Sequence, residues 1–285
     1  MKKLIVKTYP KNNLTLDVLS KRPDGYHEVK MIMQTISLYD EVTIELIPSG
    51  IELSTNKYYL PNNQKNTAYL ACQYFLDYFN INSTGVKIFI KKNLPVAAGI
   101  AGGSSNAAGV IKGLNTLLGI HAPIDVLMEI GKKVGADVPY CILGKTALAE
   151  GLGEKLTPLP SLPPTWICLA KPNFSMSTAK VYQRLDVAHL SEHPDTDGMI
   201  QAISQGDIPG VAKRLFNVLE TVTIKQKPVL NKIKKMMMDQ GALGCVMSGS
   251  GPTIFGLFAT RKAAQKACFE LRKHVGYAQI AKTMV

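Results

Sequence analysis

The chain has 285 residues, of which 46% are hydrophobic and 19% are charged, and its formal net charge is +12. This composition is enough for a sizeable core, which we expect to be divided between two domains. No apolar run of about 18 residues is present, so the sequence predicts no membrane-spanning helix. The N-terminal residues 1–7 are typical of a strand and lack the apolar region of a signal peptide.

The cysteines and the basic charge narrow the function classes further. No two of the five cysteines form a C-x-x-C spacing, and each lies in an apolar segment. They predict buried thiols in a reducing, cytoplasmic compartment and argue against a structural zinc site. The positive charge fits a solvated surface or attraction of anionic small molecules such as nucleotides. A basic stripe with interleaved aromatic residues is missing, so we expect neither nucleic acid nor a membrane as partner.

Hydrophobic periodicity predicts alternating strands and helices in the first half of the chain. Strands are expected at residues 2–8, 14–19, 29–38, 42–47 and 85–90, with a Pro-Gly turn at 21–25. Helices are expected at residues 67–79, from residue 104 to about residue 118, and at 124–134. Short strands are expected at residues 139–143 and 146–149.

A proline-rich segment, residues 156–164, is the expected hinge, so the predicted domains are 1–158 and 159–285. Beyond it we expect helices at 177–184 (with Ser177 or Thr178 as cap) and 211–219, with short helical pieces within 186–210. Strands at 166–170, 243–247, 253–258 and 279–284 and helices at 228–240 and 261–273 follow a β-α-β-β-α-β order, as in a ferredoxin-like fold. The predicted fold class is α+β in two lobes.

The most informative stretch is the glycine-rich segment Leu94–Leu118. Small residues fill positions 95–103, and Ser104 is then a candidate N-cap for a helix with a regular apolar face. The first turn of a helix presents unpaired N–H groups and the positive end of the helix dipole, and glycines let an anion approach them. The segment therefore predicts a polyphosphate site, with a tightly packed Gly/Ala loop as the alternative. It does not match a Walker motif, because no lysine precedes Ser104.

The sequence P-V-A-A-G-I-A-G-G-S-S-N-A-A at 95–108 resembles the phosphate-binding loop of the GHMP kinase superfamily. Two shorter motifs of that superfamily are similar to Pro10–Leu14, which contains Lys11, and to Gly135–Pro139, which contains Asp137. The resemblance implies a mixed β/α N-terminal domain, a ferredoxin-like C-terminal domain, and ATP with Mg²⁺ as cofactors. It also implies that Asp137 lies near the acceptor hydroxyl.

The implied pairing of Lys11 with Asp137 is chemically reasonable. A lysine beside the carboxylate would keep it ionised and help to polarise the hydroxyl, so that the carboxylate can accept its proton. Phosphoryl transfer needs mainly positioning and charge neutralisation, and such a pair supplies both. Taken singly, the aspartate could simply bond the backbone of its turn, and the lysine could be solvated.

Within the superfamily, residues 10–35 resemble the 4-diphosphocytidyl-2-C-methyl-D-erythritol kinases, with R-P-D-G-Y-H at 22–27 as the hallmark. Residues 147–154 and 248–251 are further matches, and the resemblance runs over nearly the whole chain. It implies ATP-dependent phosphorylation of the 2-hydroxyl of 4-diphosphocytidyl-2-C-methyl-D-erythritol in non-mevalonate isoprenoid biosynthesis. The expected partners are therefore ATP and this small molecule, bound by a monomer or weak dimer.

The resemblance also implies roles for individual residues. Tyr26 would stack on cytosine, His27 would hydrogen-bond its edge, and Asn13 would bind polar groups of the substrate. Thr178 and Tyr182, one helical turn apart, would close the cytidine pocket. The implied ATP site consists of Asn66, Lys92, Pro95, Val96, Ala97, Ala98, Gly99, Ile100, Ala101, Gly102, Gly103, Ser104 and Ser105. Ser105 would also offer an oxygen to Mg²⁺, and the turn 248–251 would border the active site or form a plain hairpin.

Several residues depart from the family pattern, among them Ala97, Ala98 and Ala101 of the glycine-rich loop, where some members have glycine. Asn12 stands where the family usually has Ile or Leu, and burial without a partner would cost about 1–3 kcal/mol. Pro10 replaces a common alanine. Three alternatives stay open: a GHMP kinase for another small alcohol, an inactive homologue that binds nucleotide, and a basic RNA-binding protein. Asn12 is the only support for the second.

Overall fold

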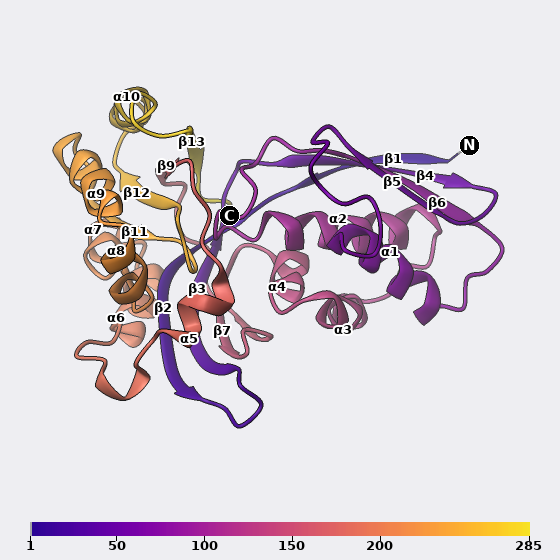
Figure 1. Cartoon of the computed structure of the whole chain (residues 1–285), viewed down its shortest axis with the longest axis horizontal. Helices are drawn as coiled ribbons and strands as arrows, with labels where there is room; N and C mark the ends of the chain where they lie inside the picture. Colours follow the sequence, from indigo (N-terminus) through magenta and orange to yellow (C-terminus); the bar gives the residue numbers. More distant parts are fainter. Residues whose placement is uncertain (1) are drawn as a thin grey trace. The chain divides into compact units, whose positions relative to one another are not determined.

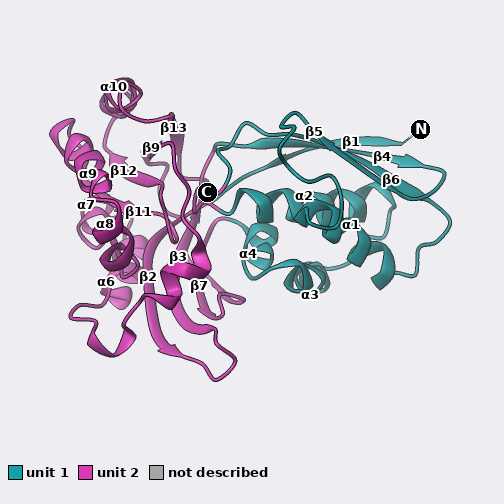
Figure 2. Cartoon of the chain, in the orientation of Figure 1, with its two compact units in different colours: residues 1–10, 38–96, 101–144 teal, residues 11–37, 97–100, 145–285 magenta. Residues whose placement is uncertain are grey.

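The computed structural model describes residues 2–285, which form two compact units (Figure 2). Among the described residues, unit 1 contains 2–10, 38–96 and 101–144, and unit 2 contains 11–37, 97–100 and 145–285. The units are thus interleaved along the chain rather than consecutive. The domain limits 1–158 and 159–285 stay a prediction.

Unit 1 is a four-stranded sheet with helices on one face (Figure 1). The strand order is β1 (Lys3–Thr8), β4 (Asp40–Ile47), β6 (Gly85–Lys91) and β5 (Ile51–Thr55), and only the β5–β6 pair is parallel. The helices are α1 (Thr67–Tyr78), α2 (Gly102–Leu117), α3 (Ile124–Val134) and α4 (Val138–Leu143). Strand β5 was not predicted, whereas β1, β4, β6, α1 and α3 confirm the expected elements.

The strand predicted at 139–143 is wrong, because these residues belong to α4. A short apolar run does not distinguish a strand from a buried helix. Here Pro139 falls in the first turn of the helix, where its fixed φ suits the helix and its missing N–H costs nothing.

The core of unit 1 lies between its sheet and its helices. Alternate residues of β4 and β6, among them Val42, Ile44 and Ile88, are fully buried, as the period of two of a strand requires. Helix α2 packs closely on this sheet, since a Cβ on Gly109 would lie 2.2 Å from Thr8 Cγ2. This close packing fixes the position of the helix whose first turn follows the glycine-rich loop.

Unit 2 contains two sheets. The first has the order β10 (Phe216–Asn217), β2 (Lys11–Lys21), β3 (His27–Thr35), β7 (Thr146–Gly151) and β8 (Lys155–Pro158), with β10 parallel to β2. Strand β2 begins at Lys11, earlier than predicted, and is bulged between Asn13 and Thr15. Residues 156–158 of the expected hinge instead pair with β7, and Pro158 is the last residue of β8, an edge strand, where a proline is tolerated.

The second sheet of unit 2 confirms the ferredoxin-like order. Its strands are β11 (Gly244–Met247), β12 (Ile254–Phe258), β9 (Trp166–Lys171) and β13 (Tyr277–Lys282), all antiparallel to their neighbours. Helices α9 (Val229–Asp239) and α10 (Arg261–Leu271) complete the β-α-β-β-α-β unit.

Short helices fill the rest of unit 2: α5 (Thr178–Gln183), η1 (Val187–His189), α6 (Thr196–Ser204), α7 (Ile208–Lys213) and α8 (Glu220–Gln226). Ser177 caps α5 as predicted, since its side chain accepts from the amide of Lys180. The helix predicted at 211–219 is wrong: α7 ends at Lys213 and Phe216 pairs with β2, so a tertiary contact overrides the local pattern. Within residues 2–285, no helix is both long and apolar enough to cross a membrane.

Candidate active site

The glycine-rich loop enters α2 two residues earlier than predicted. The N-cap is Ala101 in a left-handed conformation with φ +56°, so the assignment of Ser104 as N-cap is wrong. The carbonyl of Ala101 accepts from the amide of Ser105 over 2.9 Å, which places both serines in the first turn. The amides of Gly102, Gly103 and Ser104 precede this bond. They are the N–H groups that a helix N-terminus offers to an anion.

The middle of the loop is joined to the turn formed by residues 248–251. Gly99 has φ +75°, and a Cβ on it would lie 2.3 Å from the carbonyl oxygen of Ser248. The hydroxyl of Ser248 donates to the carbonyl of Gly99 over 2.9 Å. Both segments belong to unit 2. The turn 248–251 therefore contacts residues 97–100 of the glycine-rich loop, and its place at the border of the active site stays a prediction.

A buried polar network lies where β6 leads into the loop, and the sequence did not reveal it. Asp40 is fully buried and accepts from the ammonium group of Lys92 at 2.5 Å and from the amides of Asn93 and Leu94 at 2.7 and 2.9 Å. Asn106 of α2 donates to Asp40 over 2.9 Å and accepts from Lys92 over 3.0 Å. One carboxylate thus ties the start of the loop to the helix that follows it.

Asn66 also has local partners. Its Oδ1 accepts from the amide of Ala68 over 3.0 Å and caps α1, and its Nδ2 donates to the carbonyl of Pro61 over 2.9 Å. The next residue, Thr67, donates to the carbonyl of Gly103 over 3.0 Å. Asn66 therefore lies next to the first turn of α2 within unit 1, and its contact with a nucleotide stays a prediction, as does that of Lys92.

Lys11 and Asn13 form a second cluster, in unit 2. Lys11 is 4% exposed, and its Nζ donates to Asn13 Oδ1 over 2.7 Å. The same oxygen accepts from the amide of Gly249 over 3.0 Å, which joins the lysine to the turn 248–251. The neighbouring side chain of Asn12 is fully buried, and its two polar atoms make no hydrogen bond within the described residues 2–285.

The residues expected to bind cytidine come together in unit 2. The ring of His27, at the start of β3, lies 5.2 Å from that of Tyr182 on α5, centroid to centroid. Burial lowers the pKa of His27, and the positive charge of Lys21 lowers it further. Thr178 and Ser250 share a hydrogen bond of 2.9 Å between their hydroxyls. Tyr26 is 65% exposed in the turn before β3, which leaves its ring accessible for stacking.

Comparison with known proteins identifies the family. The GHMP kinases N terminal domain matches residues 66–145, and the GHMP kinases C terminal domain matches residues 199–276. A 4-diphosphocytidyl-2-C-methyl-D-erythritol kinase of Caldicellulosiruptor saccharolyticus is 50% identical over 270 residues, which cover 94% of this chain and 93% of that protein. The kinase of the same name from Clostridium perfringens is 50% identical over 269 residues, again 94% of this chain and 93% of that protein. The chain belongs to the 4-diphosphocytidyl-2-C-methyl-D-erythritol kinases.

A solved structure agrees with this assignment. A crystal structure of 4-(cytidine 5'-diphospho)-2C-methyl-D-erythritol kinase is 31% identical to the chain, with a TM-score of 0.85 over 99% of this chain and all of that one. A homoserine kinase from Cytophaga hutchinsonii, 20% identical with a TM-score of 0.79, shares the fold. The expected two-domain GHMP kinase fold is therefore confirmed.

Two residues expected to act together in this kinase family lie in different units. Lys11 belongs to unit 2, and Asp137 belongs to unit 1, where it is the half-buried N-cap residue of α4. The side chain of Asp137 makes no capping hydrogen bond, so its carboxylate is not committed to the helix. The pairing of Asp137 with Lys11 stays a prediction.

The chemistry of Ser105 is compatible with Mg²⁺. Its hydroxyl donates to the carbonyl of Gly102 over 2.9 Å, which uses the hydrogen and leaves oxygen lone pairs. Mg²⁺ in kinases takes oxygen ligands, most of them from phosphates and water, so one protein oxygen at this site fits the ion. Within residues 2–285, His, Cys, Asp and Glu side chains form no group of three or more that could hold a metal ion.

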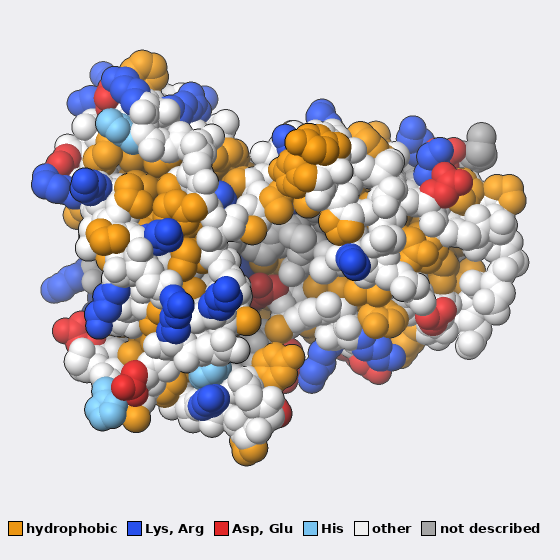
Figure 3. Space-filling model, in the orientation of Figure 1, with side chains coloured by type: hydrophobic (Ala, Val, Ile, Leu, Met, Phe, Trp, Pro, Cys, Tyr) orange, Lys and Arg blue, Asp and Glu red, His pale blue; other side chains and the backbone are white. Residues whose placement is uncertain are grey.

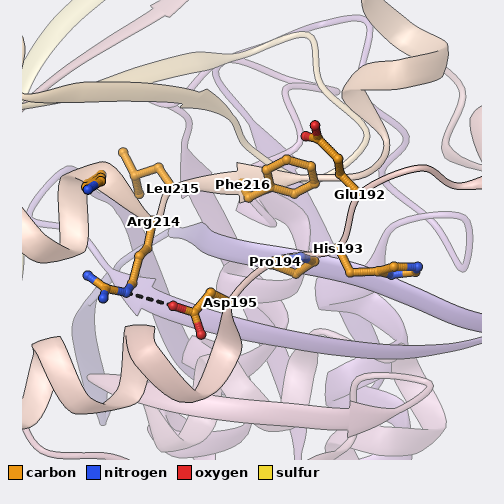
Figure 4. A pocket seen from close by; sticks show the side chains of 8 residues that line it. Glu192, His193, Pro194, Asp195, Arg214, Leu215 and Phe216 are labelled. Atoms are coloured by element: carbon orange, nitrogen blue, oxygen red, sulfur yellow. Dashed lines mark hydrogen bonds and ion pairs between the residues drawn. The ribbon is translucent and has the colours of Figure 1, made fainter.

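A separate hollow of about 410 Å³ lies in unit 2 and is lined by residues 192–195 and 213–216 (Figure 4). None of the residues expected to bind substrate in this kinase family lines it. Arg214 donates to Asp195 over 2.9 Å across the hollow, which neutralises both charges. On the face in Figure 3, Lys and Arg side chains lie scattered rather than in one stripe. Neither feature indicates a second nucleotide site.

Proposed function

We propose that the chain transfers the γ-phosphate of ATP to the 2-hydroxyl of 4-diphosphocytidyl-2-C-methyl-D-erythritol, a cytoplasmic step of non-mevalonate isoprenoid biosynthesis. The observation that carries this choice of substrate is the arrangement around His27, whose ring packs on Tyr182 beside the exposed Tyr26. A pyrimidine needs one aromatic face and one or two hydrogen-bonding groups at its edge, and these residues supply both.

The state of His27 supports the recognition of cytosine. Because burial lowers its pKa, the imidazole is neutral near pH 7, with one ring nitrogen as donor and the other as acceptor. A neutral ring can bond the edge of cytosine without placing a positive charge against it. Tyr26 would cover the face of the base, and Thr178 and Tyr182 would close the pocket from α5.

The glycine-rich loop would bind the phosphates of ATP. The first-turn amides of α2, from Gly102 to Ser104, would donate to phosphate oxygens, and the helix dipole would favour their negative charge. Ser105 would offer an oxygen to Mg²⁺, which neutralises phosphate charge when it is bound. The loop and Asp40 hold these groups in place before ATP arrives.

The phosphoryl transfer would use Asp137 and Lys11. Asp137 would accept the proton of the 2-hydroxyl while the hydroxyl oxygen of the substrate bonds to the γ-phosphorus of ATP. The bond between the γ-phosphorus and the bridging oxygen would break, and ADP would leave. Lys11 would keep the carboxylate ionised and stabilise charge on the hydroxyl oxygen. The phosphate would pass directly from ATP to the alcohol without a phosphoenzyme.

An ADP-release assay tests this function. The purified full chain, with ATP and Mg²⁺, should release ADP only when 4-diphosphocytidyl-2-C-methyl-D-erythritol is present. Mevalonate and a sugar, offered at the same concentration, should give at most a small fraction of that rate. A higher rate with another alcohol would reject the proposed substrate. Nucleotide binding without ADP release would favour the inactive homologue to which Asn12 points, because its polar atoms make no hydrogen bond within residues 2–285.

A further inference from the structure

Asn217 is the last residue of β10, and its side chain, which is 3% exposed, is buried against the turn 248–251. Its Nδ2 donates to the carbonyls of Met247 and Gly249, both over 2.8 Å. Its Oδ1 accepts from the amide of Leu219 over 2.9 Å. Both hydrogens of the amide group are therefore used on the backbone of one turn, which fixes the path of that turn.

Hydrogen bonds through Asn13 connect this turn to Lys11. The amide of Gly249 donates to Asn13 Oδ1 over 3.0 Å, and this oxygen also accepts from Lys11 Nζ over 2.7 Å. Asn217 itself pairs with Leu16 on β2, the strand that carries Lys11. The contacts form a closed ring within unit 2, from β2 through β10 and the turn back to β2.

Such a ring matters for phosphoryl transfer because the reaction depends on the placement of charge. The Lys11 side chain is long and flexible, and Asn13 Oδ1 orients its ammonium group by accepting a hydrogen bond from it. We propose that Asn217 is a positioning residue for Lys11 and acts through the turn 248–251 and Asn13. This inference rests on the role of Lys11 in the proposed function.

The Asn217→Ala variant tests the proposal. It removes both donors, leaves the carbonyls of Met247 and Gly249 without their partner, and allows the turn and Asn13 to shift. In the ADP-release assay we expect kcat to fall about tenfold or more, because small misplacements of catalytic groups are costly. Calorimetry would measure the dissociation constants of 4-diphosphocytidyl-2-C-methyl-D-erythritol and of a non-hydrolysable ATP analogue. Both constants should change by less than about threefold, since Lys11 acts on the transition state.

A stability control separates positioning from general loosening. Leu271 is fully buried on α10, in the ferredoxin-like part of unit 2, and Leu271→Ala should lower Tm at least as much as Asn217→Ala. At a temperature where both variants are folded, Leu271→Ala should keep kcat within about twofold of the unmodified chain. If Asn217→Ala does not fold, Asn217→Asp keeps the size and the acceptor for Leu219 but lacks both donors, and the same loss of kcat is expected.

The proposal is overturned if the folded Asn217 variant keeps kcat within twofold of the unmodified chain. It is also overturned if both dissociation constants rise as much as kcat falls, since that would indicate a loosened site rather than a misplaced lysine. Either result would overturn only the role of Asn217. If the proposed function itself is wrong, the unmodified chain will release no ADP with the cytidine diphosphate substrate, and both proposals fall.

Discussion

Asp40 and Lys92 form a buried ion pair in unit 1, with 2.5 Å between Asp40 Oδ2 and Lys92 Nζ. The side chain of Lys92 is 5% exposed and that of Asp40 is fully buried. Asp40 also binds the amides of Asn93 and Leu94, which directly precede the glycine-rich loop. A lysine expected to contact the nucleotide thus has a protein partner of its own, and the pair holds the beginning of the glycine-rich loop.

Lys92→Met should therefore act first on stability. The substitution leaves the carboxylate of Asp40 buried without its cation, which costs about 3–5 kcal/mol when a buried pair is broken. We expect the free energy of unfolding, measured by urea denaturation, to fall by this amount. A loss below about 1 kcal/mol together with a large rise in the KM for ATP would show instead that Lys92 serves mainly the nucleotide.

Lys91→Met is the matched control for this experiment. Lys91 is the preceding residue and pairs with Glu41 over 2.9 Å, but its side chain is 56% exposed. Exposed ion pairs contribute about 0.2–1 kcal/mol, so this variant should lose little stability and keep its activity. A loss equal to that of Lys92→Met would mean that burial of the Asp40 pair is not the reason for its importance.

Gly99→Ala should distort the glycine-rich loop. The added Cβ would lie 2.3 Å from the carbonyl oxygen of Ser248, a backbone atom that cannot rotate away, and φ at this position is +75°. The loop would separate from the turn 248–251, so we expect kcat/KM for ATP to fall by about 100-fold. Steady-state kinetics with varied ATP measure this.

Gly50→Ala separates the steric effect at Gly99 from backbone strain. Gly50 has nearly the same φ, +76°, but a Cβ there would meet no atom within 4 Å. It should therefore cost only the left-handed conformation, about 1–2 kcal/mol of stability, with unchanged kinetics. Equal kinetic losses in the two variants would contradict the assignment of residues 97–100 to the ATP site.

The sequence predicted those parts of the site whose information is local. The glycine-rich loop, the helix at 124–134 and the turn before His27 all follow from residues close together in the chain, and the structure confirms them. The start of α2 at Gly102 was not predictable from Ser104, because the cap is the backbone of Ala101 in a left-handed conformation. An alanine there carries no capping signal.

The remaining features of the candidate site depend on contacts between residues that are far apart in the sequence, and no single residue predicts such contacts. Asp40 stands between Tyr39 and Glu41 in a strand, and its partner Lys92 is 52 residues away. Asn217 lies in a segment with helical spacing, yet it pairs with β2 and binds the turn 248–251. Side chains with these roles become visible only once the strands have been placed next to each other.

Tyr26→Ala should weaken binding of the cytidine substrate more than binding of ATP. Tyr26 is 65% exposed, so its removal costs little stability and leaves the rest of the site intact. Loss of an aromatic stacking partner is worth about 1–3 kcal/mol per base, which corresponds to a rise in the substrate KM of roughly fivefold to 150-fold. Tyr26→Phe keeps the ring and should behave like the unmodified chain. Equal rises in both KM values after Tyr26→Ala would argue against stacking on cytosine.

Asp137→Asn is the sharpest test of the proposed chemistry. The side chain of Asp137 makes no capping bond to α4, so the amide should leave the fold and Tm nearly unchanged. An amide cannot accept the proton of the hydroxyl, and general-base catalysis typically contributes about 10²–10⁴-fold, so kcat should fall by that factor. The KM values for ATP and for the alcohol should change far less, because the carboxylate acts mainly in the transition state. Near-normal turnover by a folded Asp137→Asn variant would remove this residue from the mechanism, and the proton would then have to leave through another group or to water.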